Sequence, residues 1–302
     1  MSAKKVLFVI NKKAGLQSKV DIEKIISNAA KKLHFQFFIY KMNNGDVIAE
    51  IKNEIKIYQP DIVAAVGGDG TVNLISQIIQ QTDISLLIIP MGSANGMAKE
   101  LQIPIQIKDC LALIVSGKEK KIDLLKVNDE ISIHLADVGL NARIVKRFQL
   151  DSKRGLLTYA KHLFFEVFVL KRTNFSIMIK GKKRRVKAVS LTFANATQYG
   201  TGAVINPDGK LNDGLFEICI VKPFPKYELI KITFQMFRRT LKYSNFFEVI
   251  QCKEARVKSQ RATLLQIDGE VIGKVKEINL TCLPVALKVL IPNHLQHPTL
   301  IN

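Results

Sequence analysis

The chain has little that would build a metal centre or a disulfide framework. Its 302 residues include four cysteines, and no two of them are separated by the two residues typical of a metal-binding pair. Cys110, Cys219, Cys252 and Cys282 are far apart and lie in apolar or strand-like surroundings. We therefore expect buried free thiols in a reducing compartment and no transition-metal site.

Long apolar runs, tryptophan and acidic residues are also scarce. No run approaches the ~20 apolar residues of a membrane-spanning helix, and Val6–Ile10 is too short for the apolar core of a signal peptide. The 45 Lys and Arg outnumber 26 Asp and Glu, which gives a net charge of +19. The composition predicts a cytoplasmic protein, soluble or lying on a membrane, with a polyanionic partner such as nucleic acid, nucleotide or an acidic membrane.

The first 128 residues alternate between strand and helix patterns. Apolar strands are predicted over 5–10, 35–41, 61–66 and 84–89, with amphipathic helices over 20–33 and 46–57 and after each of the last two strands. This alternation predicts a parallel, Rossmann-like α/β domain. Ligands of such sheets bind at loops that follow strands.

From residue 129 the pattern changes to short alternating strands separated by turn signals. Strands are predicted over 131–138, 174–180, 186–194, 215–221, 247–251, 255–258, 262–267 and 276–282, with helices near 153–170 and 226–242. The sequence thus predicts a mostly antiparallel β domain over 129–285. The α/β domain would contain 1–128 and 286–302.

The most informative motif is the glycine-rich turn Gly67-Gly68-Asp69-Gly70-Thr71, between a strand and a helix. Glycines allow a phosphate to approach the backbone, and a helix N-terminus attracts anions. The Asp69 carboxylate would repel phosphate unless it holds a metal ion or takes a proton. The turn therefore predicts a phosphate site with chemistry in it, against the alternative of an ordinary turn capped by Thr71.

Further motifs follow in a fixed order. They are Pro90-Met-Gly-Ser-Ala-Asn95, Asp137-Val-Gly-Leu-Asn-Ala142, Asp208-Gly-Lys-Leu-Asn-Asp-Gly-Leu215 and Gln266-Ile-Asp-Gly-Glu270. With the glycine turn, this set resembles the diacylglycerol kinase catalytic-domain family, which also includes sphingosine and ceramide kinases. NAD kinases are more distant relatives.

The resemblance implies a three-layer α/β nucleotide domain, a β-sandwich-like second domain and an active-site cleft between them. It implies a lipid kinase that uses ATP and Mg²⁺, most simply one that converts diacylglycerol to phosphatidic acid. The expected partners are the lipid substrate and an anionic membrane, and a homodimer stays open. The C-terminal strand near Leu287–Ile291 is expected to return to the first domain.

Site residues follow from the resemblance, position by position. Glu270, Asp268 and Asp69 are the expected catalytic carboxylates, with Glu270 as proton acceptor. Mg²⁺ is expected at Asp213 with the carbonyl oxygens of Lys210 and Leu215. The expected nucleotide-binding residues are Asn11, Gly15, Gly67, Gly68, Asp69, Gly70, Thr71, Asn73, Ser93 and Asn95.

Several positions depart from the family pattern. Lys12 replaces a proline, Lys41 a nucleotide-contacting threonine, Leu74 a glutamate and Gly96 an aspartate. Arg143 lies where sphingosine kinases carry acidic residues that could hold an amino-lipid. This disfavours a cationic sphingoid base and favours a neutral glycerolipid.

Alternatives remain at this point. Asp268-Gly269 is also the signature of a type I′ hairpin turn, and Asn212-Asp-Gly214 can be a plain turn. A sphingoid-base, ceramide or other lipid kinase is open, and an NAD kinase is weaker because no Gly-Ser-Thr-Ala-Tyr-type segment is present. From a different class, a basic nucleic-acid-binding protein fits the charge but lacks a recognisable binding motif.

The charge is concentrated between residues 139 and 190, where fourteen Lys and Arg face two acidic residues. Within this region, Leu163–Leu170 is strongly apolar and flanked by Lys161, Lys171 and Arg172. A basic amphipathic helix over 153–172 is therefore predicted to lie reversibly on an anionic membrane, against the alternative of a core helix with a solvated basic face.

Overall fold

The protein was studied as a computed structural model, which describes residues 3–11, 21–43, 45–150, 161–162 and 172–293. The chain divides into two compact units. Unit 1 contains Met1–Ile122 and Ala286–Asn302, and unit 2 contains Asp123–Val285. In the part of the chain that is described, no helix is both long and apolar enough to cross a membrane.

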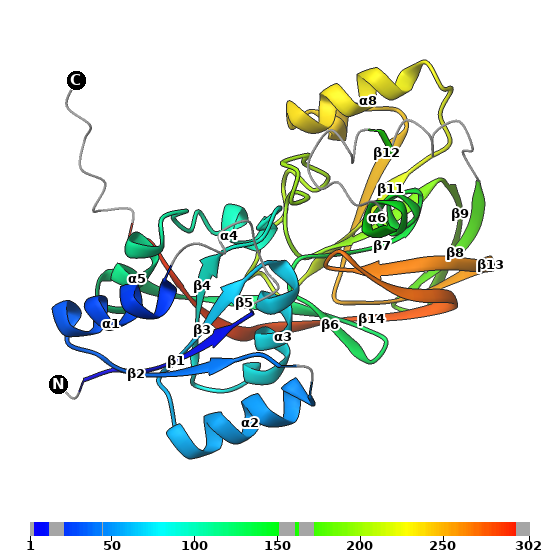
Figure 1. Cartoon of the computed structure of the whole chain (residues 1–302). Helices are drawn as coiled ribbons and strands as arrows, with labels where there is room; N and C mark the ends of the chain where they lie inside the picture. Colours follow the sequence, from blue (N-terminus) through cyan, green and yellow to red (C-terminus); the bar gives the residue numbers. More distant parts are fainter. Residues whose placement is uncertain (1–2, 12–20, 44, 151–160, 163–171, 294–302) are drawn as a thin grey trace, which may run out of the picture. The chain divides into compact units, whose positions relative to one another are not determined.

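Unit 1 is built on a parallel sheet in the order β2-β1-β3-β4 (Figure 1). Each pair is in parallel register, for example Val6 beside Ile62 and Gly67 beside Pro90. β1 and β3 are almost fully buried, as expected of central strands covered on both faces. The strands are β1 (Lys5–Ile10), β2 (Gln36–Lys41), β3 (Ile62–Gly67) and β4 (Ser85–Pro90).

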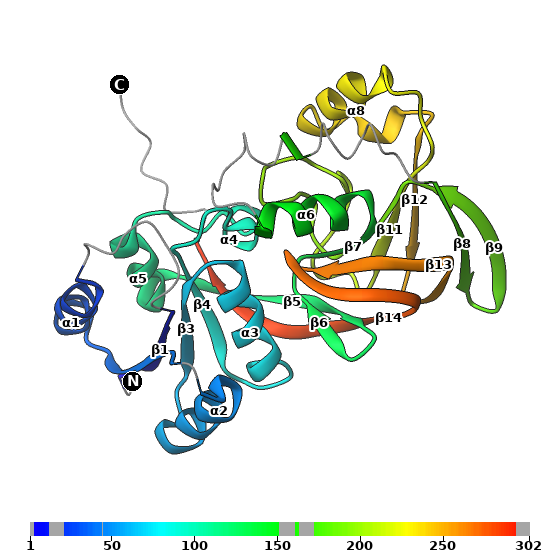
Figure 2. The same cartoon turned by 45° about the vertical axis from the view of Figure 1, so that its right-hand side comes forward.

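Helices cover both faces of this sheet. α1 and α5 lie on one face, and α2 and α3 lie on the other (Figures 1 and 2). The carboxylates of Asp21 and Asp46 cap α1 and α2 by accepting backbone N–H groups of Lys24 and Ala49. The helices are α1 (Ile22–Leu33), α2 (Val47–Tyr58), α3 (Asp69–Ile79), α4 (Gly96–Glu100) and α5 (Ile107–Ser116). The parallel α/β prediction is confirmed.

Two elements of this part of the chain were not predicted, namely α5 and β5 (Lys118–Val127). The sequence indicated one helix after β4, whereas the chain forms α4 and then α5, with Pro104 between them. The returning C-terminal strand was predicted correctly. β14 (Glu270–Ile291) ends beside β4 in parallel register, with Lys288 opposite Ser85 and Val289 opposite Leu86.

Unit 2 is antiparallel, as predicted, with the order β12-β11-β10-β7-β13. Two predicted strands are one bent strand, β13, whose register against β14 shifts between Lys258 and Thr263. The predicted strand 186–194 is instead two strands, β9 and β10. The strands are β6 (Glu130–Ser132), β7 (Leu135–Gly139), β8 (Thr173–Ile179), β9 (Lys182–Ala188), β10 (Ser190–Ala194), β11 (Phe216–Val221), β12 (Phe247–Cys252) and β13 (Glu254–Ile267).

Alternate residues of these strands form the core of unit 2, which includes Phe175, Phe193, Phe216 and Leu265. Helix α6 (Leu140–Leu150) packs on β7 and β13, and α8 (Glu228–Phe237) lies at the margin of the unit in both views (Figures 1 and 2). The predicted helix 153–170 falls almost entirely outside the described residues.

The four cysteines are buried free thiols, as predicted. Burial raises the thiol pKa of Cys110, Cys252 and Cys282 to about 12, so these groups stay protonated and unreactive at neutral pH.

Candidate active site

The first group of predicted site residues lies in unit 1, where β3 passes into α3. Gly68 is the N-cap of α3, and no side chain caps the helix. Thr71 is buried, and its hydroxyl accepts a hydrogen bond from Asn11 Nδ2 over 3.2 Å instead of capping the turn. The positive end of the α3 dipole is therefore left without a capping side chain, as in an anion site.

The glycines of this turn allow two loops to touch through their backbones. A Cβ atom on Gly92 would lie 2.5 Å from the Cα of Gly68, and one on Gly67 would lie 2.3 Å from Thr71 Oγ1. The N–H of Met91 donates to the carbonyl of Gly67 over 2.8 Å. The loops after β3 and β4 consequently form one surface, which larger residues would push apart.

Asn95 holds the shape of the loop after β4. Its Oδ1 accepts from the N–H of Gly92 over 2.9 Å, and its Nδ2 donates to the carbonyl of Gly92 over 2.8 Å. Its backbone is left-handed, with φ of 51°. Ser93 is exposed within the loop that Asn95 closes. The structure therefore gives Asn95 a loop-shaping role and leaves Ser93 accessible.

Asp69 lies in the first turn of α3 and reaches the start of α4. Its Oδ1 accepts from the N–H of Met97 over 3.3 Å. Gly70 is exposed and Asn73 is half-buried on the same helix. Unit 1 thus brings the predicted phosphate-binding residues together, except that Gly15 lies outside the described residues.

The structure shows the surroundings of two residues that depart from the family pattern. Lys41 ends β2 and forms an ion pair with Glu23 of α1 over 2.5 Å, so its ammonium faces a helix of unit 1. Gly96 is buried at the start of α4.

The second group of predicted residues lies in unit 2, at the turn between β13 and β14. Asp268 and Gly269 both have positive φ, 48° and 89°, which is the pattern of a type I′ turn. The hairpin alternative is therefore correct for the backbone. The turn places Glu270, an exposed residue, at the first position of β14.

The Asp268 carboxylate is buried and fully engaged by its own unit. It accepts hydrogen bonds from the Ser132 hydroxyl over 2.7 Å and from the N–H groups of Ile133, His134 and Leu135 over 2.9–3.1 Å. Burial raises its pKa, and the nearby His134 and these hydrogen bonds oppose the rise. This geometry makes Asp268 an anchor for the turn that carries Glu270.

A cluster around Asp137 was not assigned a role by sequence reasoning. The buried Asp137 carboxylate accepts from Asn141 Nδ2 over 2.6 Å, from Tyr199 Oη over 2.9 Å, and from the side chains of Thr192 and Gln266. Burial raises its pKa, against the four donors. The sequence signal that could have indicated this cluster is a single aspartate within an apolar strand, followed four residues later by an asparagine.

This cluster borders an apolar cavity of about 150 Å³ within unit 2. Asn141, Thr192 and Tyr199 supply polar atoms to its wall, and the rest is mainly apolar side chains of α8 and neighbouring segments, such as Leu229 and Ile232. The cavity combines an apolar interior with a few polar groups at one side, as small-molecule sites do, but it is smaller than the ~300–1,000 Å³ of a typical ligand pocket.

The predicted metal site lies in the turn before β11. Asp213 is exposed; its Oδ1 accepts from the N–H of Leu215 over 3.1 Å and its Oδ2 from Gln251 Nε2 over 3.3 Å. Buried Asp123 braces the same turn by accepting from the N–H of Gly214 over 2.7 Å, a contact that sequence reasoning missed. In the described residues no three His, Cys, Asp or Glu gather around a common point. One carboxylate with backbone carbonyls and water still suits Mg²⁺.

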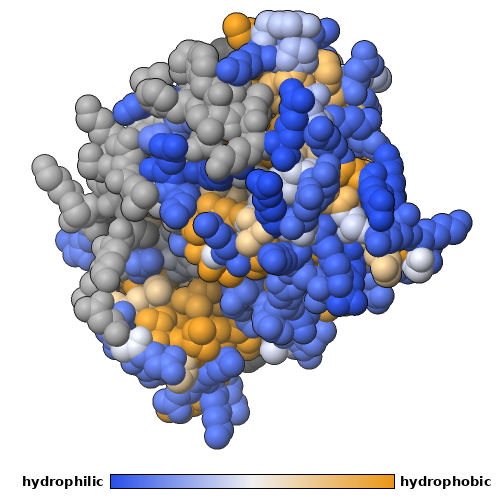
Figure 3. Space-filling view, turned by 90° about the vertical axis from the view of Figure 1, so that its right-hand side faces the viewer, coloured by the Kyte–Doolittle hydropathy of each residue, from blue (hydrophilic) through white to orange (hydrophobic). Residues whose placement is uncertain are grey.

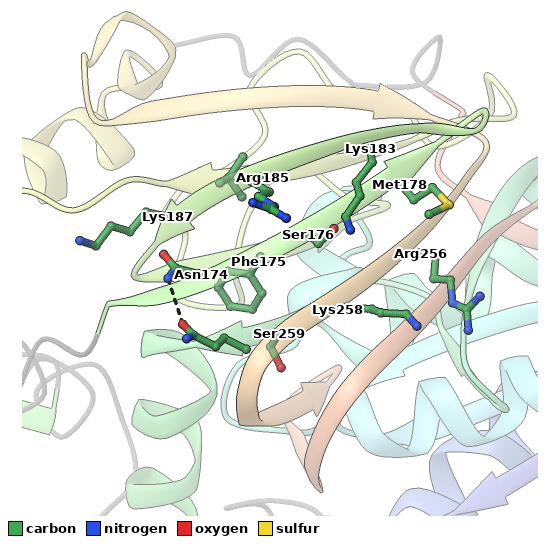
Figure 4. A pocket seen from close by; sticks show the side chains of 12 residues that line it. Asn174, Phe175, Ser176, Met178, Lys183, Arg185, Lys187, Arg256, Lys258 and Ser259 are labelled. Carbon is green, nitrogen blue, oxygen red and sulfur yellow. Dashed lines mark hydrogen bonds between the residues drawn. The ribbon is translucent and has the colours of Figure 1, made fainter.

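A basic groove crosses β8, β9 and β13 (Figure 4). Its volume is about 860 Å³, and it is lined by Lys183, Arg185, Lys187, Arg256 and Lys258. Glu277 pairs with Arg256 and Lys258 at one margin. The surface over these strands is mostly hydrophilic, as Figure 3 shows. The groove combines these basic side chains with the apolar side chains of Phe175, Met178 and Val186.

Comparison with known families decides between the classes left open. Residues 5–127 match the diacylglycerol kinase catalytic domain, and residues 135–291 match the YegS C-terminal NAD kinase beta sandwich-like domain. The chain belongs to the YegS-like and diacylglycerol kinase family. It is a lipid kinase, a phosphotransferase, and membership of this family implies ATP as the phosphate donor and a lipid as acceptor.

Individual relatives agree with this assignment. A YegS-like protein of Chromohalobacter salexigens, named as a probable lipid kinase, is 30% identical over 69% of both chains. A diacylglycerol kinase of Mycobacterium tuberculosis is 26% identical over 78% of both chains. A crystal structure described as a diacylglycerol kinase from Bacillus anthracis has the same fold, with a TM-score of 0.74 and 17% identity over 97% of this chain and 99% of that one.

Proposed function

We propose that this lipid kinase transfers the γ-phosphate of ATP to the hydroxyl of a neutral lipid, most simply converting diacylglycerol to phosphatidic acid. The observation that carries the proposal is the apolar cavity of unit 2. The carboxylate beside it, Asp137, already accepts two hydrogen bonds on each oxygen from four side chains, so no lone pair is left for a lipid ammonium group. A neutral lipid therefore suits this wall better than a sphingoid base.

The phosphate side of the reaction is assigned to unit 1. The uncapped N-terminus of α3 and the paired glycine loops would hold the phosphates of ATP, with Ser93 and Asn11 beside them. Asp69 would hold Mg²⁺ or the transferring proton. Phosphoryl transfer depends mainly on such positioning and charge neutralisation.

The acceptor side of the reaction is assigned to the β13–β14 turn. Glu270 would accept the proton of the lipid hydroxyl, a role worth roughly 10²–10⁴-fold in rate. Asp268 would act through the backbone, because its hydrogen bonds to residues 132–135 fix the turn. It is a positioning residue in this scheme.

Mg²⁺ is proposed at Asp213, with the carbonyl oxygens of Lys210 and Leu215. The hydrogen bond from Leu215 N–H to Asp213 and the brace from Asp123 to Gly214 N–H keep this turn in one shape. A bound Mg²⁺ would neutralise charge and stiffen the turn. The residues that the turn presents are compatible with this ion.

The decisive experiment incubates the purified protein with labelled ATP, Mg²⁺ and a panel of diacylglycerol, ceramide, sphingosine and NAD. We expect label on diacylglycerol. Label on sphingosine or ceramide alone would support the alternative lipid acceptors, and label on NAD alone would overturn the proposal.

A nucleic-acid-binding function is tested in parallel, because the basic groove on β8, β9 and β13 gives it a surface. The assay is retention of labelled RNA and DNA on a filter with the intact protein. Retention that disappears in Lys183→Ser/Arg185→Ser would show that the groove of this kinase also binds nucleic acid.

A further inference from the structure

Helix α8 has two apolar faces, and in the part of the chain that the structure describes only one of them is covered. The inner face, with Leu229, Ile232 and Met236, lines the cavity of unit 2. Ile232 is only 5% exposed. An ordinary amphipathic helix would bury this one face and present only polar residues on the other.

The outer face carries a second stripe, formed by Tyr227, Ile230, Phe234 and Phe237. Their spacing of three, four and three residues places them on one side of the helix, away from Leu229, Ile232 and Met236 of the inner face. They are 78%, 81%, 58% and 50% exposed. Large apolar residues normally occur singly on a surface, so a stripe of four marks a docking surface.

Basic residues flank this outer stripe. Residues 226–243 contain five Lys and Arg and one acidic residue, Glu228, which pairs with Lys231; Asp208 pairs with Lys242 from outside this segment. The Arg238 guanidinium lies 5.0 Å from the centre of the Phe234 ring, and Lys242 Nζ lies 5.6 Å from that of Tyr243, which is 74% exposed. Blue and orange surfaces adjoin at the top of the molecule in Figure 3, where Figure 1 places α8. Cations beside exposed aromatics match the headgroup and acyl layers of an anionic membrane.

We propose that the outer stripe of α8 docks the enzyme on an anionic phospholipid membrane, with its apolar side chains at the acyl boundary and the flanking cations among the headgroups. Phe237 belongs to the stripe and also lines the cavity, so α8 would connect the membrane to the cavity. That connection rests on the proposed lipid substrate, but docking itself can be measured without turnover.

The first test measures binding to vesicles of phosphatidylcholine, with and without phosphatidylglycerol. We expect binding only with phosphatidylglycerol, weakening as salt is raised, because headgroup attraction is screened. Ile230→Ser/Phe234→Ser removes two stripe residues that do not line the cavity, and should weaken binding on the order of 30-fold or more. Ile57→Ser, which removes an apolar residue of α2 whose exposure lies between those of Ile230 and Phe234, should leave binding unchanged.

The absence of tryptophan allows a second, direct test. Phe234→Trp places a single indole on the stripe, and Ile57→Trp places one on the control helix. Emission from the first should shift to shorter wavelength with anionic vesicles and be quenched by brominated acyl chains, whereas emission from the second should not change.

Other outcomes would overturn the docking proposal. Undiminished vesicle binding by a folded Ile230→Ser/Phe234→Ser variant would reject it, and loss of binding in Lys183→Ser/Arg185→Ser instead would assign docking to the basic groove. If sedimentation shows a dimer that this α8 variant dissociates, and vesicles do not bind, the stripe is an interface between copies. The proposed function fails separately, if the parent phosphorylates no water-soluble short-chain diacylglycerol.

Discussion

Ser132 and Asp268 are 136 positions apart in the sequence, yet the Ser132 hydroxyl donates to Asp268 Oδ1 over 2.7 Å in the interior of unit 2. The contact ties the β13–β14 turn to the last residue of β6. This hydrogen bond therefore holds the turn that carries Glu270 in one position.

Asp268→Asn should destabilise unit 2. The amide of asparagine has an NH₂ group in place of one carboxylate oxygen that accepts backbone N–H groups. At least one backbone N–H would then face another hydrogen-bond donor and lose its acceptor. We expect a loss of about 1–3 kcal/mol in the free energy of unfolding, measured by urea denaturation. Asp129→Asn, at an exposed site in the turn between β5 and β6, should change the unfolding free energy little. Equal stability of the two variants would contradict the anchoring role.

Gly92→Ala should separate the loops that follow β3 and β4. The added Cβ would lie 2.5 Å from the Gly68 Cα and 2.9 Å from Asn95 Oδ1, and the backbone contact has no flexible group that could move aside cheaply. We expect a stability loss of about 1–3 kcal/mol and weaker ATP binding, measured by calorimetry. Ala94→Ser, in the same loop but exposed, is the control and should bind ATP normally.

Asp69→Asn should lower turnover by at least about 100-fold without unfolding the protein. The new amide oxygen can still accept from the N–H of Met97, so the link between α3 and α4 survives. Only the charge is lost. Steady-state kinetics and thermal unfolding check the two halves of this prediction, with the exposed Asp109→Asn as control. Near-normal rates would return Asp69 to the role of a turn residue.

Asp137→Asn should change how stability depends on pH. Burial raises the pKa of Asp137, so the folded protein binds its proton more tightly than the unfolded chain does. The carboxyl therefore makes the folded state lose stability as pH rises from about 4, where an unfolded aspartate ionises, up to the raised pKa.

The asparagine variant has no such ionisation, and the hydroxyls of Thr192 and Tyr199 can turn to accept from its NH₂ group. Its free energy of unfolding, measured by urea denaturation from pH 4 to 8, should fall less with rising pH than that of the parent. A parallel pair of profiles would show that Asp137 does not titrate in this range.

Much of unit 1 could be predicted because its signals are local. Buried strands read as apolar runs, α1 and α2 begin at aspartate caps, and the glycine turn lies directly between β3 and α3. Each of these features depends on residues within one or two turns of chain. The motifs also indicated the family, because their order along the sequence carries that information.

Other features depended on residues distant in sequence. Nothing local tells that Asp268 binds residues 132–135 or that Thr71 bonds to Asn11. The same holds for three of the donors to Asp137, namely Thr192, Tyr199 and Gln266. Nor does the amphipathic pattern of α8 say which of its two apolar faces is covered. Composition and periodicity determined the elements and their class, whereas burial and long-range hydrogen bonding, which only the folded chain supplies, decided what each polar side chain does.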